Sequence, residues 1–316
     1  VIEGVGYFEG QKKSGMKIDF IDISRAYFQA DAIRNVYVEL PAEDSEPGMC
    51  SKLVRAMYGT RDAPQNLEFE YTDFMNGLGF VSGKSAPCLF HHEPRNLRAV
   101  VYGDDFTVLG PEQELDWFRK QMKKRYEVEF KARLGYGQED DKSVSLLNRP
   151  IELLPSGISY EADQRHVEII RRDLGIGDKV RHTPFPYERV TAEELTQNSP
   201  ELDPASATQY RAVVARANYL SQDRSDIRQA VKELSRSMSC PCERDWSRLK
   251  RLGRYLAQHP RLIQNFRRQS ATKFLDVWVD TDFAGCLKTR KSTSGGVITI
   301  GDHVIKSWSN TQRVIA

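Results

Sequence analysis

Two adjacent carboxylates stand in the middle of the chain, in the stretch Leu97–Gly110, which reads LRAVVYGDDFTVLG. The flanking apolar runs, Ala99–Tyr102 and Phe106–Leu109, are rich in β-branched and aromatic residues and are too short for helices. We therefore predict two buried strands with the Gly-Asp-Asp sequence of residues 103–105 as the turn between them. Adjacent carboxylates on a rigid tip repel each other unless a cation lies there. A pair of divalent metal ions, and with it phosphoryl transfer, fits this requirement.

The same tripeptide is also favourable turn chemistry, because Gly and Asp tolerate the dihedrals of tight hairpins. A third carboxylate upstream favours the metal-binding alternative. Lys17–Ile23 reads KIDFIDI and is predicted to be a strand with Asp22 near its end. A carboxylate at the end of a buried strand needs a metal ion, a base or a solvent opening. A solvent-exposed Asp at a strand end is the alternative.

The elements that must position these carboxylates can be read from the apolar spacing. Val36–Leu40 is a predicted strand, and Tyr58–Pro64 a turn that starts a helix. A second helix is expected after Pro111. The inward stripes of these helices are Leu67, Tyr71, Phe74 and Leu78 in the first, and Leu115, Phe118 and Met122 in the second. Strand, crossover helix, and a hairpin backed by a helix make an α+β layer, in which Asp22 is free to lie beside the turn.

The composition sets wider bounds. The 316 residues allow two or three compact units, and 46 basic against 44 acidic residues leave a net charge of +2, so net charge does not indicate a nucleic-acid-binding protein. A hydrophobic content of 40% is typical of soluble globular proteins. We expect no membrane association, because no run is long enough to span a bilayer and no signal peptide is recognisable. Five scattered cysteines suit reduced thiols in the cytoplasm or nucleus.

The second half of the chain carries a basic helix and a predicted sheet. Basic residues gather on the helix around residues 244–256, and such a run is either a solvated face or a track for a nucleic-acid backbone. Phe274–Asp282 alternates strictly and is predicted to be a strand, followed by strands at Ser294–Ile300 and His303–Trp308.

Three segments together resemble the palm motifs of reverse transcriptases. They are Ile21–Phe28 (IDISRAYF), Tyr58–Pro64 (YGTRDAP) and Tyr102–Asp105 (YGDD). The sequence is most similar to the Pol polyprotein of copia-type (Pseudoviridae-like) long-terminal-repeat retrotransposons. In that family the motifs typically read DVKTAFL, YGLKQAPRAW and YVDD. Order, spacing and flanking residues agree.

The resemblance continues over residues 16–316. Asp163–Gly175, Tyr210–Ile227 and Leu234–Leu256 are similar to the stretches that follow the palm in this family. Val279–Gly285 and Arg290–Gly296 are similar to the opening of its ribonuclease H domain.

The resemblance implies an α+β fold built around the palm of a right-hand polymerase, with the fingers largely missing. We expect the palm at residues 16–125, a thumb-like hairpin and helix at 126–185, and a helical connection segment at 186–270. Residues 271–316 would be the truncated N-terminal part of a ribonuclease H-like domain, in which Asp280 is a remnant of the catalytic set. A single Asp cannot organise two metal ions, so we expect no ribonuclease H activity.

Roles for individual residues also follow from the resemblance. Asp22, Asp104 and Asp105 would be the catalytic residues, binding two Mg²⁺ ions, with Mn²⁺ as a substitute. The backbone carbonyl of Ile23 would be an additional ligand. Tyr102 would support the primer terminus.

The remaining predicted site residues concern substrate and nucleic acid. Tyr27 would exclude the 2′-hydroxyl of ribonucleotides, and a core aromatic is its alternative role. Asp62 lies in the second motif and would contact substrate or template. The expected partners are an RNA template, a DNA primer, deoxynucleoside triphosphates and other parts of a Pol polyprotein, in a cytoplasmic virus-like particle or in the nucleus. The nucleic-acid-binding residues would be Arg248, Lys250, Arg251 and Arg254.

The sequence departs from the family pattern in several places. Gly103 replaces the usual Val, Asp62 the usual Gln and Leu67 the usual Trp. Only a short unrelated stretch precedes Lys17, where the family has its fingers. Residues 131–134 (KARL) are similar to a fingers sequence but follow the palm, which we attribute to coincidence. An inactive relic that at most binds nucleic acid and, because of Gly103, an RNA-dependent RNA polymerase are therefore the alternatives to an RNA-directed DNA polymerase.

Overall fold

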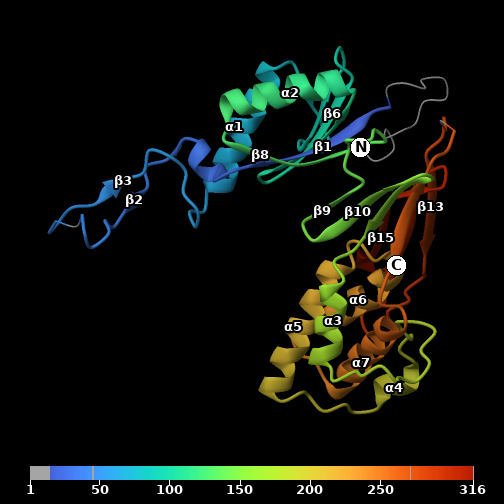
Figure 1. Cartoon of the computed structure of the whole chain (residues 1–316). Coiled ribbons are helices and arrows are strands. Elements are labelled where there is room, and N and C mark those ends of the chain that lie inside the picture. Colours follow the sequence, from blue (N-terminus) through green and yellow to red (C-terminus); the bar gives the residue numbers. More distant parts are fainter. Residues whose placement is uncertain (1–14, 45, 271, 316) are drawn as a thin grey trace. The chain divides into compact units, whose positions relative to one another are not determined.

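The structure is a computed structural model that describes residues 15–44, 46–270 and 272–315 (Figure 1). Of the short stretch that precedes Lys17, residues 1–14 lie outside the described residues. The chain divides into two compact units. The first comprises the described residues up to Val144 together with Leu153–Gly157, and the second comprises Ser145–Glu152 and the residues from Ile158 onward. Within the described ranges, no helix combines the length and apolar character needed to cross a membrane.

A six-stranded sheet forms the centre of the first unit. Its strand order is β4-β5-β6-β7-β1-β8, and all neighbouring strands are antiparallel. In chain order its strands are β1 (Lys17–Ile23), β4 (Val81–Ser82), β5 (Leu89–His92), β6 (Leu97–Tyr102), β7 (Asp105–Gly110) and β8 (Val128–Leu134). The predicted central hairpin is confirmed as β6 and β7. β1, which is distant in sequence, pairs directly with β7.

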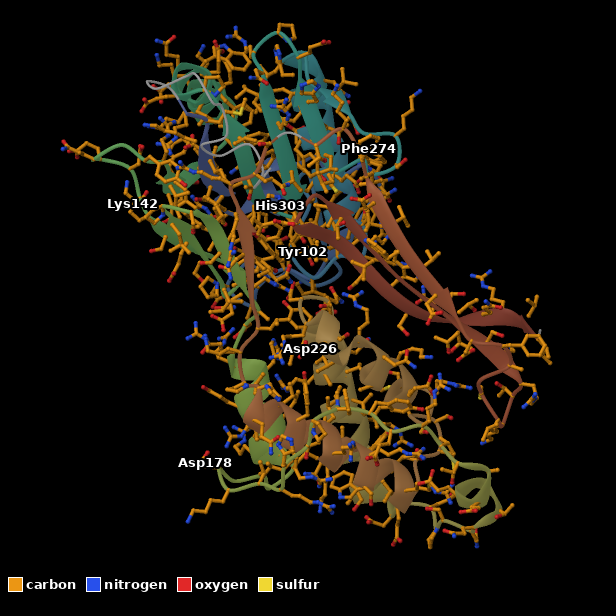
Figure 2. The ribbon with its side chains drawn as sticks, turned by 90° about the vertical axis from the view of Figure 1, so that its right-hand side faces the viewer. Tyr102, Lys142, Asp178, Asp226, Phe274 and His303 are labelled. Carbon is orange, nitrogen blue, oxygen red and sulfur yellow. The ribbon has the colours of Figure 1, made fainter. Side chains whose placement is uncertain are left out.

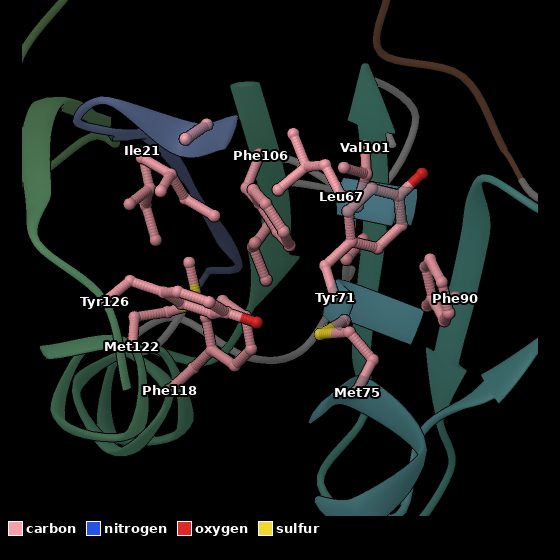
Figure 3. Packing of buried hydrophobic residues seen from close by; sticks show 14 of the residues in the cluster. Ile21, Leu67, Tyr71, Met75, Phe90, Val101, Phe106, Phe118, Met122 and Tyr126 are labelled. Atoms are coloured by element: carbon pink, nitrogen blue, oxygen red, sulfur yellow. The ribbon is translucent and has the colours of Figure 1, made fainter. Parts of the chain in front are cut away.

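Two helices pack on one face of this sheet, α1 (Ala63–Gly77) and α2 (Glu112–Arg125) (Figure 1). Both predicted apolar stripes are confirmed, because Leu67 and Tyr71 of α1 and Phe118 of α2 are buried in the same cluster as Phe106 of β7 (Figure 3). Pro111 stands at the N-cap of α2 and Gly79, with φ +94°, follows the last turn of α1. This core fixes the strands whose ends carry the carboxylates.

Short elements complete the first unit. They are the 3₁₀ helix η2 (Ala26–Gln29) and the strand pair β2 (Tyr37–Val38) and β3 (Ser51–Lys52). The strand predicted at Val36–Leu40 is thus only two residues long. The sheet also extends beyond residue 125, where we placed the end of the palm, because β8 pairs with β1.

Helices dominate the second unit. They are α3 (Arg165–Asp173), α4 (Ala192–Thr196), α5 (Pro204–Leu220), η3 (Ser225–Ile227), α6 (Arg228–Ser235) and α7 (Glu243–Gln258). Apolar residues at helical spacing, among them Tyr210 of α5, Val231 of α6 and Leu249 of α7, form one buried cluster. Ile227, Val231 and Leu234 form a buried stripe at helical spacing within this cluster.

Two further sheets contain the remaining strands. One has the order β12-β11-β10-β9 and the other the order β13-β14-β15. Their bounds are β9 (Ser143–Leu146), β10 (Arg149–Leu154), β11 (Gly157–Glu161), β12 (Ile263–Arg267), β13 (Asp276–Thr281), β14 (Lys291–Ile300) and β15 (His303–Ile315). The predicted strands of the last sheet are confirmed. Every residue of β13 is exposed, however, so the alternation of apolar and polar residues along it does not separate a buried face from a solvent-exposed face. Figure 2 labels buried His303 and exposed Phe274 from this region.

Candidate metal centre

The pairing of β1 with β7 places Asp22 directly opposite Asp105. Like charges in directly opposite positions of an antiparallel pair are destabilising. Asp104 joins them from the turn, and one carboxylate oxygen from each of the three residues lies within 4.8 Å of the others. The fold therefore brings Asp22, which lies far upstream in the sequence, to the adjacent Asp104 and Asp105 at one end of the hairpin.

The turn itself is short and held from the neighbouring strand. Tyr102 and Asp105 are paired across β6 and β7, so the loop has two residues, and Gly103 at its first position has φ +64°. This is the position at which a type II′ turn requires glycine. The amide of Ile23 donates a hydrogen bond to the carbonyl of Asp104 over 3.1 Å, which fixes the turn beside the end of β1.

The electrostatics of the cluster favour a bound cation. Burial raises the pKa of Asp104, and the negative charges of Asp22 and Asp105 raise it further. Asp105 is buried and the other two carboxylates are partly exposed, so the cluster can be reached from solvent. Carboxylate oxygens are the donors that hard divalent cations such as Mg²⁺ prefer. The three side chains fit a divalent metal ion in number, chemistry and spacing.

Sequence reasoning missed one residue of this cluster, Lys131 on β8. Its ammonium lies 2.7 Å from Oδ1 of Asp22 and 3.0 Å from Oδ1 of Asp105. Burial lowers the pKa of Lys131, but the hydrogen bonds to both carboxylates outweigh it and leave the pKa raised. A lysine on the strand after the second helix was the available signal, yet no local pattern shows that this strand pairs with β1.

The residues predicted to contact substrate lie in different settings. Tyr27 on η2 is half-buried, with its ring centroid 4.6 Å from that of Tyr58 in an edge-on contact. Tyr102 at the end of β6 is 70% exposed, and Ile23 is fully buried. Asp62 precedes α1 and forms an ion pair with Arg34, whose Nε lies 2.9 Å from Oδ2 of Asp62. This contact lowers the pKa of Asp62. Their roles stay predictions.

The predicted nucleic-acid-binding residues all lie on α7. Arg248 forms an ion pair with Glu194 at 3.0 Å, and Arg251 one with Glu188 at 2.7 Å. Lys250 is exposed, and Arg254 is partly exposed. Two of these four predicted residues thus already have acidic partners within the second unit.

Asp280 lies on β13 opposite Gly295 and is exposed. Among the described residues, the group of Asp22, Asp104 and Asp105 is the one set of three or more potential metal ligands with this spacing, and it does not include Asp280.

Comparison with known proteins shows which family and which relatives the chain resembles. Residues 11–136, which include the whole carboxylate cluster and Lys131, match the family described as reverse transcriptase (RNA-dependent DNA polymerase). The chain is 27% identical over 299 residues to the retrovirus-related Pol polyprotein from transposon RE2 of Arabidopsis thaliana, and 28% identical over 300 residues to that from transposon RE1 of the same plant. Each match covers 93% of this chain and 19% of the relative, so the chain spans about a fifth of these polyproteins.

A solved structure of a foamy viral protease-reverse transcriptase in complex with an RNA/DNA hybrid is similar over 94% of this chain and 33% of that one. The identity is 12% and the TM-score 0.47, which is too low to transfer any structural detail. The sequence matches over nearly the whole chain carry the assignment. Residues 11–136 match the reverse transcriptase family, and nearly the whole chain is similar to retrovirus-related Pol polyproteins from transposons.

Proposed function

We propose that this chain carries the polymerase centre of an RNA-directed DNA polymerase that works by two-metal nucleotidyl transfer. The observation that carries the proposal is the meeting of Asp22, Asp104 and Asp105 within 4.8 Å. These carboxylates would hold two Mg²⁺ ions, for which Mn²⁺ could substitute. When bound, such a pair stabilises the attacking and leaving oxygens of an in-line displacement.

The other side chains would orient the reactants. Tyr102, which is exposed beside the turn, would support a primer terminus. The buried backbone of Ile23 would offer its carbonyl as a further ligand. Tyr27, held on its edge by Tyr58, would restrict space near the sugar of a deoxynucleoside triphosphate. Asp62 would act at the template side through its pairing with Arg34.

We also infer the division of the chain from its resemblance to the family. The palm would span residues 16–125 and take β8 as an additional strand. A thumb-like segment at 126–185, a connection segment at 186–270 and a ribonuclease H-like part at 271–316 would follow. The antiparallel order β13-β14-β15 is compatible with the last of these.

Primer extension tests the polymerase proposal. With an RNA template, a DNA primer, deoxynucleoside triphosphates and Mg²⁺, we expect extension by the native chain. Asp104→Asn should abolish it, because the substitution removes one carboxylate from the cluster. Asp73→Asn, an identical change at an exposed position of α1, is the matched control and should leave extension unchanged.

The alternatives predict different results. If the native chain binds the RNA–DNA hybrid without extending the primer at any metal concentration, the chain is an inactive relic. Faster incorporation of ribonucleotides than of deoxynucleotides would favour an RNA-dependent RNA polymerase, the alternative that Gly103 suggests.

A further inference from the structure

Lys131 is delivered to the carboxylate cluster by an irregularity of the sheet. On β8, Ala132 pairs with Phe20 of β1, and the next pair along the ladder joins Phe130 to Ile21. Lys131 is therefore an extra residue, with no position opposite it on β1. Such a bulge places two residues of one strand against one of its neighbour and changes the direction of a side chain.

The bulge decides which face of the sheet Lys131 occupies. Side chains alternate between the two faces of a strand, so Lys131 and Arg133 would share a face in a regular β8. Arg133 forms an ion pair with Asp19 of β1. Asp19 is three positions from Asp22, so these two side chains point to opposite faces of the sheet. Lys131 nevertheless contacts Asp22. One inserted residue has moved a lysine from the helix-covered face to the face of the metal centre.

The ammonium of Lys131 contacts two of the three carboxylates that would bind a metal ion. It lies within hydrogen-bond distance of one oxygen of Asp22 and one of Asp105, the two carboxylates that oppose each other across β1 and β7. It thereby compensates the cross-strand repulsion. Asp104, the third member, makes no hydrogen bond to Lys131 among the described contacts.

We propose that Lys131 is a built-in counter-ion of the metal centre, which a divalent cation must displace from Asp22 and Asp105 in order to bind. Lys131 then lowers the affinity of the cluster for a divalent ion. Its removal should raise this affinity, because the ammonium no longer competes for the carboxylate oxygens and no longer repels the metal ion. The inference rests on the proposed metal-binding function. It adds a positioning residue that acts on metal loading and touches no reacting atom.

Binding of Mn²⁺ alone, without nucleic acid or nucleotide, tests this role. The concentration of free Mn²⁺ is followed by electron paramagnetic resonance during titration of the whole chain. We expect Lys131→Gln to bind Mn²⁺ about tenfold more tightly than the native chain, a difference of about 1.4 kcal/mol. Lys120→Gln, the same change of charge at an exposed position of α2, is the matched control and should bind like the native chain.

Three more variants keep the test decisive. Lys131→Arg retains the positive charge and should bind Mn²⁺ nearly as the native chain does. Lys131→Met retains the apolar stem and should also bind Mn²⁺ tightly. It replaces Lys131→Gln in the test if Lys131→Gln does not fold. Adding Asp104→Asn to Lys131→Gln should remove the tight binding, which locates the ion at the cluster.

The outcomes separate this inference from the polymerase proposal. Equal Mn²⁺ affinities for Lys131→Gln, Lys131→Met and Lys120→Gln would overturn the role of Lys131 while leaving the metal centre in place. Tight binding that survives Asp104→Asn would also overturn it. Tighter binding by the Lys131 variants together with no primer extension by the native chain would support the counter-ion and refute the polymerase. No Mn²⁺ binding by any variant would refute both.

Discussion

At the scale of single residues, Gly103 determines how the hairpin presents Asp104. Its φ of +64° lies in the region that L-residues with side chains rarely adopt. A Cβ added there would meet no other atom within 4 Å, so the restriction comes from the backbone alone. The glycine that departs from the family pattern is thus well suited to the turn that this chain forms.

Replacement of Gly103 by Val tests this explanation. We expect Gly103→Val to lower the free energy of unfolding by about 1–2 kcal/mol, because a β-branched side chain disfavours left-handed backbone conformations. Gly103→Asn should cost less, since Asn tolerates positive φ. Chemical denaturation of the three proteins provides the measurement. A Val variant as stable as the native chain would show that the turn can adopt another conformation without cost.

The residue scale also shows what the sequence could reveal. Asp19 and Asp22 both lie between apolar residues, but they are three positions apart, so on a strand they must face opposite sides. That rule predicts different surroundings for the two carboxylates, and in the structure Asp19 is buried and Asp22 is partly exposed. Lys131 could not be found in this way, because its face depends on a bulge that exists only in the pairing of β8 with β1.

At the scale of elements, Asp19 joins β1 to β8 and α2. Its carboxylate is fully buried and accepts paired hydrogen bonds from two guanidinium groups, from Arg119 at 2.7 and 2.9 Å and from Arg133 at 2.6 and 2.8 Å. A buried carboxylate is tolerated only with such partners. This arrangement anchors the strand on which Asp22 stands.

Loss of this charge should be costly. We expect Asp19→Asn to destabilise the chain by about 3–5 kcal/mol, because two partly buried guanidinium groups lose their counter-charge. Asp22→Asn, the same change three residues further along β1, should cost far less, since it relieves the repulsion with Asp105. Thermal and urea denaturation compare the two variants. Similar losses for both would contradict the different roles assigned to the two faces of β1.

An ion pair between Glu161 of β11 and Arg261, which precedes β12, gives the second unit a pH-dependent contribution to stability. The Arg261 guanidinium lowers the pKa of the buried Glu161 from its ordinary value of 4.5. A carboxyl with a lower pKa in the folded state contributes stability that is present above the ordinary value and is lost as pH falls through the folded value. The native chain should therefore lose stability below pH 4.5 more steeply than Glu161→Gln. Parallel acid titrations followed by circular dichroism would disprove this if their slopes coincided.

At the scale of the whole molecule, the sequence predicts the cluster of basic residues on α7 but not which of them form ion pairs with distant carboxylates. Arg248 and Arg251 are compensated by Glu194 and Glu188, which lie more than fifty residues away in sequence. Local periodicity identifies which residues share a helix face, but it does not show which distant carboxylates reach that face. For the same reason the helices themselves were predictable and their charge partners were not.

This difference yields a prediction about nucleic-acid binding. Lys250→Gln and Arg254→Gln should each weaken binding of an RNA–DNA hybrid and reduce the slope of log Kd against log salt concentration by about 0.7–0.9. Arg248→Gln and Arg251→Gln should change both less, because these residues already have acidic partners. Fluorescence anisotropy at several salt concentrations measures both quantities. Equal effects of all four substitutions would mean that nucleic acid displaces the internal carboxylates.

Because a lysine already sits against two of the three acidic side chains, the protein carries its own substitute for the ion it would use. We expect prolonged exposure to a chelator to change the melting temperature of the native chain by less than about 1 °C. It should lower the melting temperature of Lys131→Gln by about 2–4 °C per kcal/mol lost, the scale for domains of about 150–250 residues. A purified sample stripped of metal would therefore remain folded. A large drop in the native melting temperature on chelation would show that the lysine does not fulfil this role.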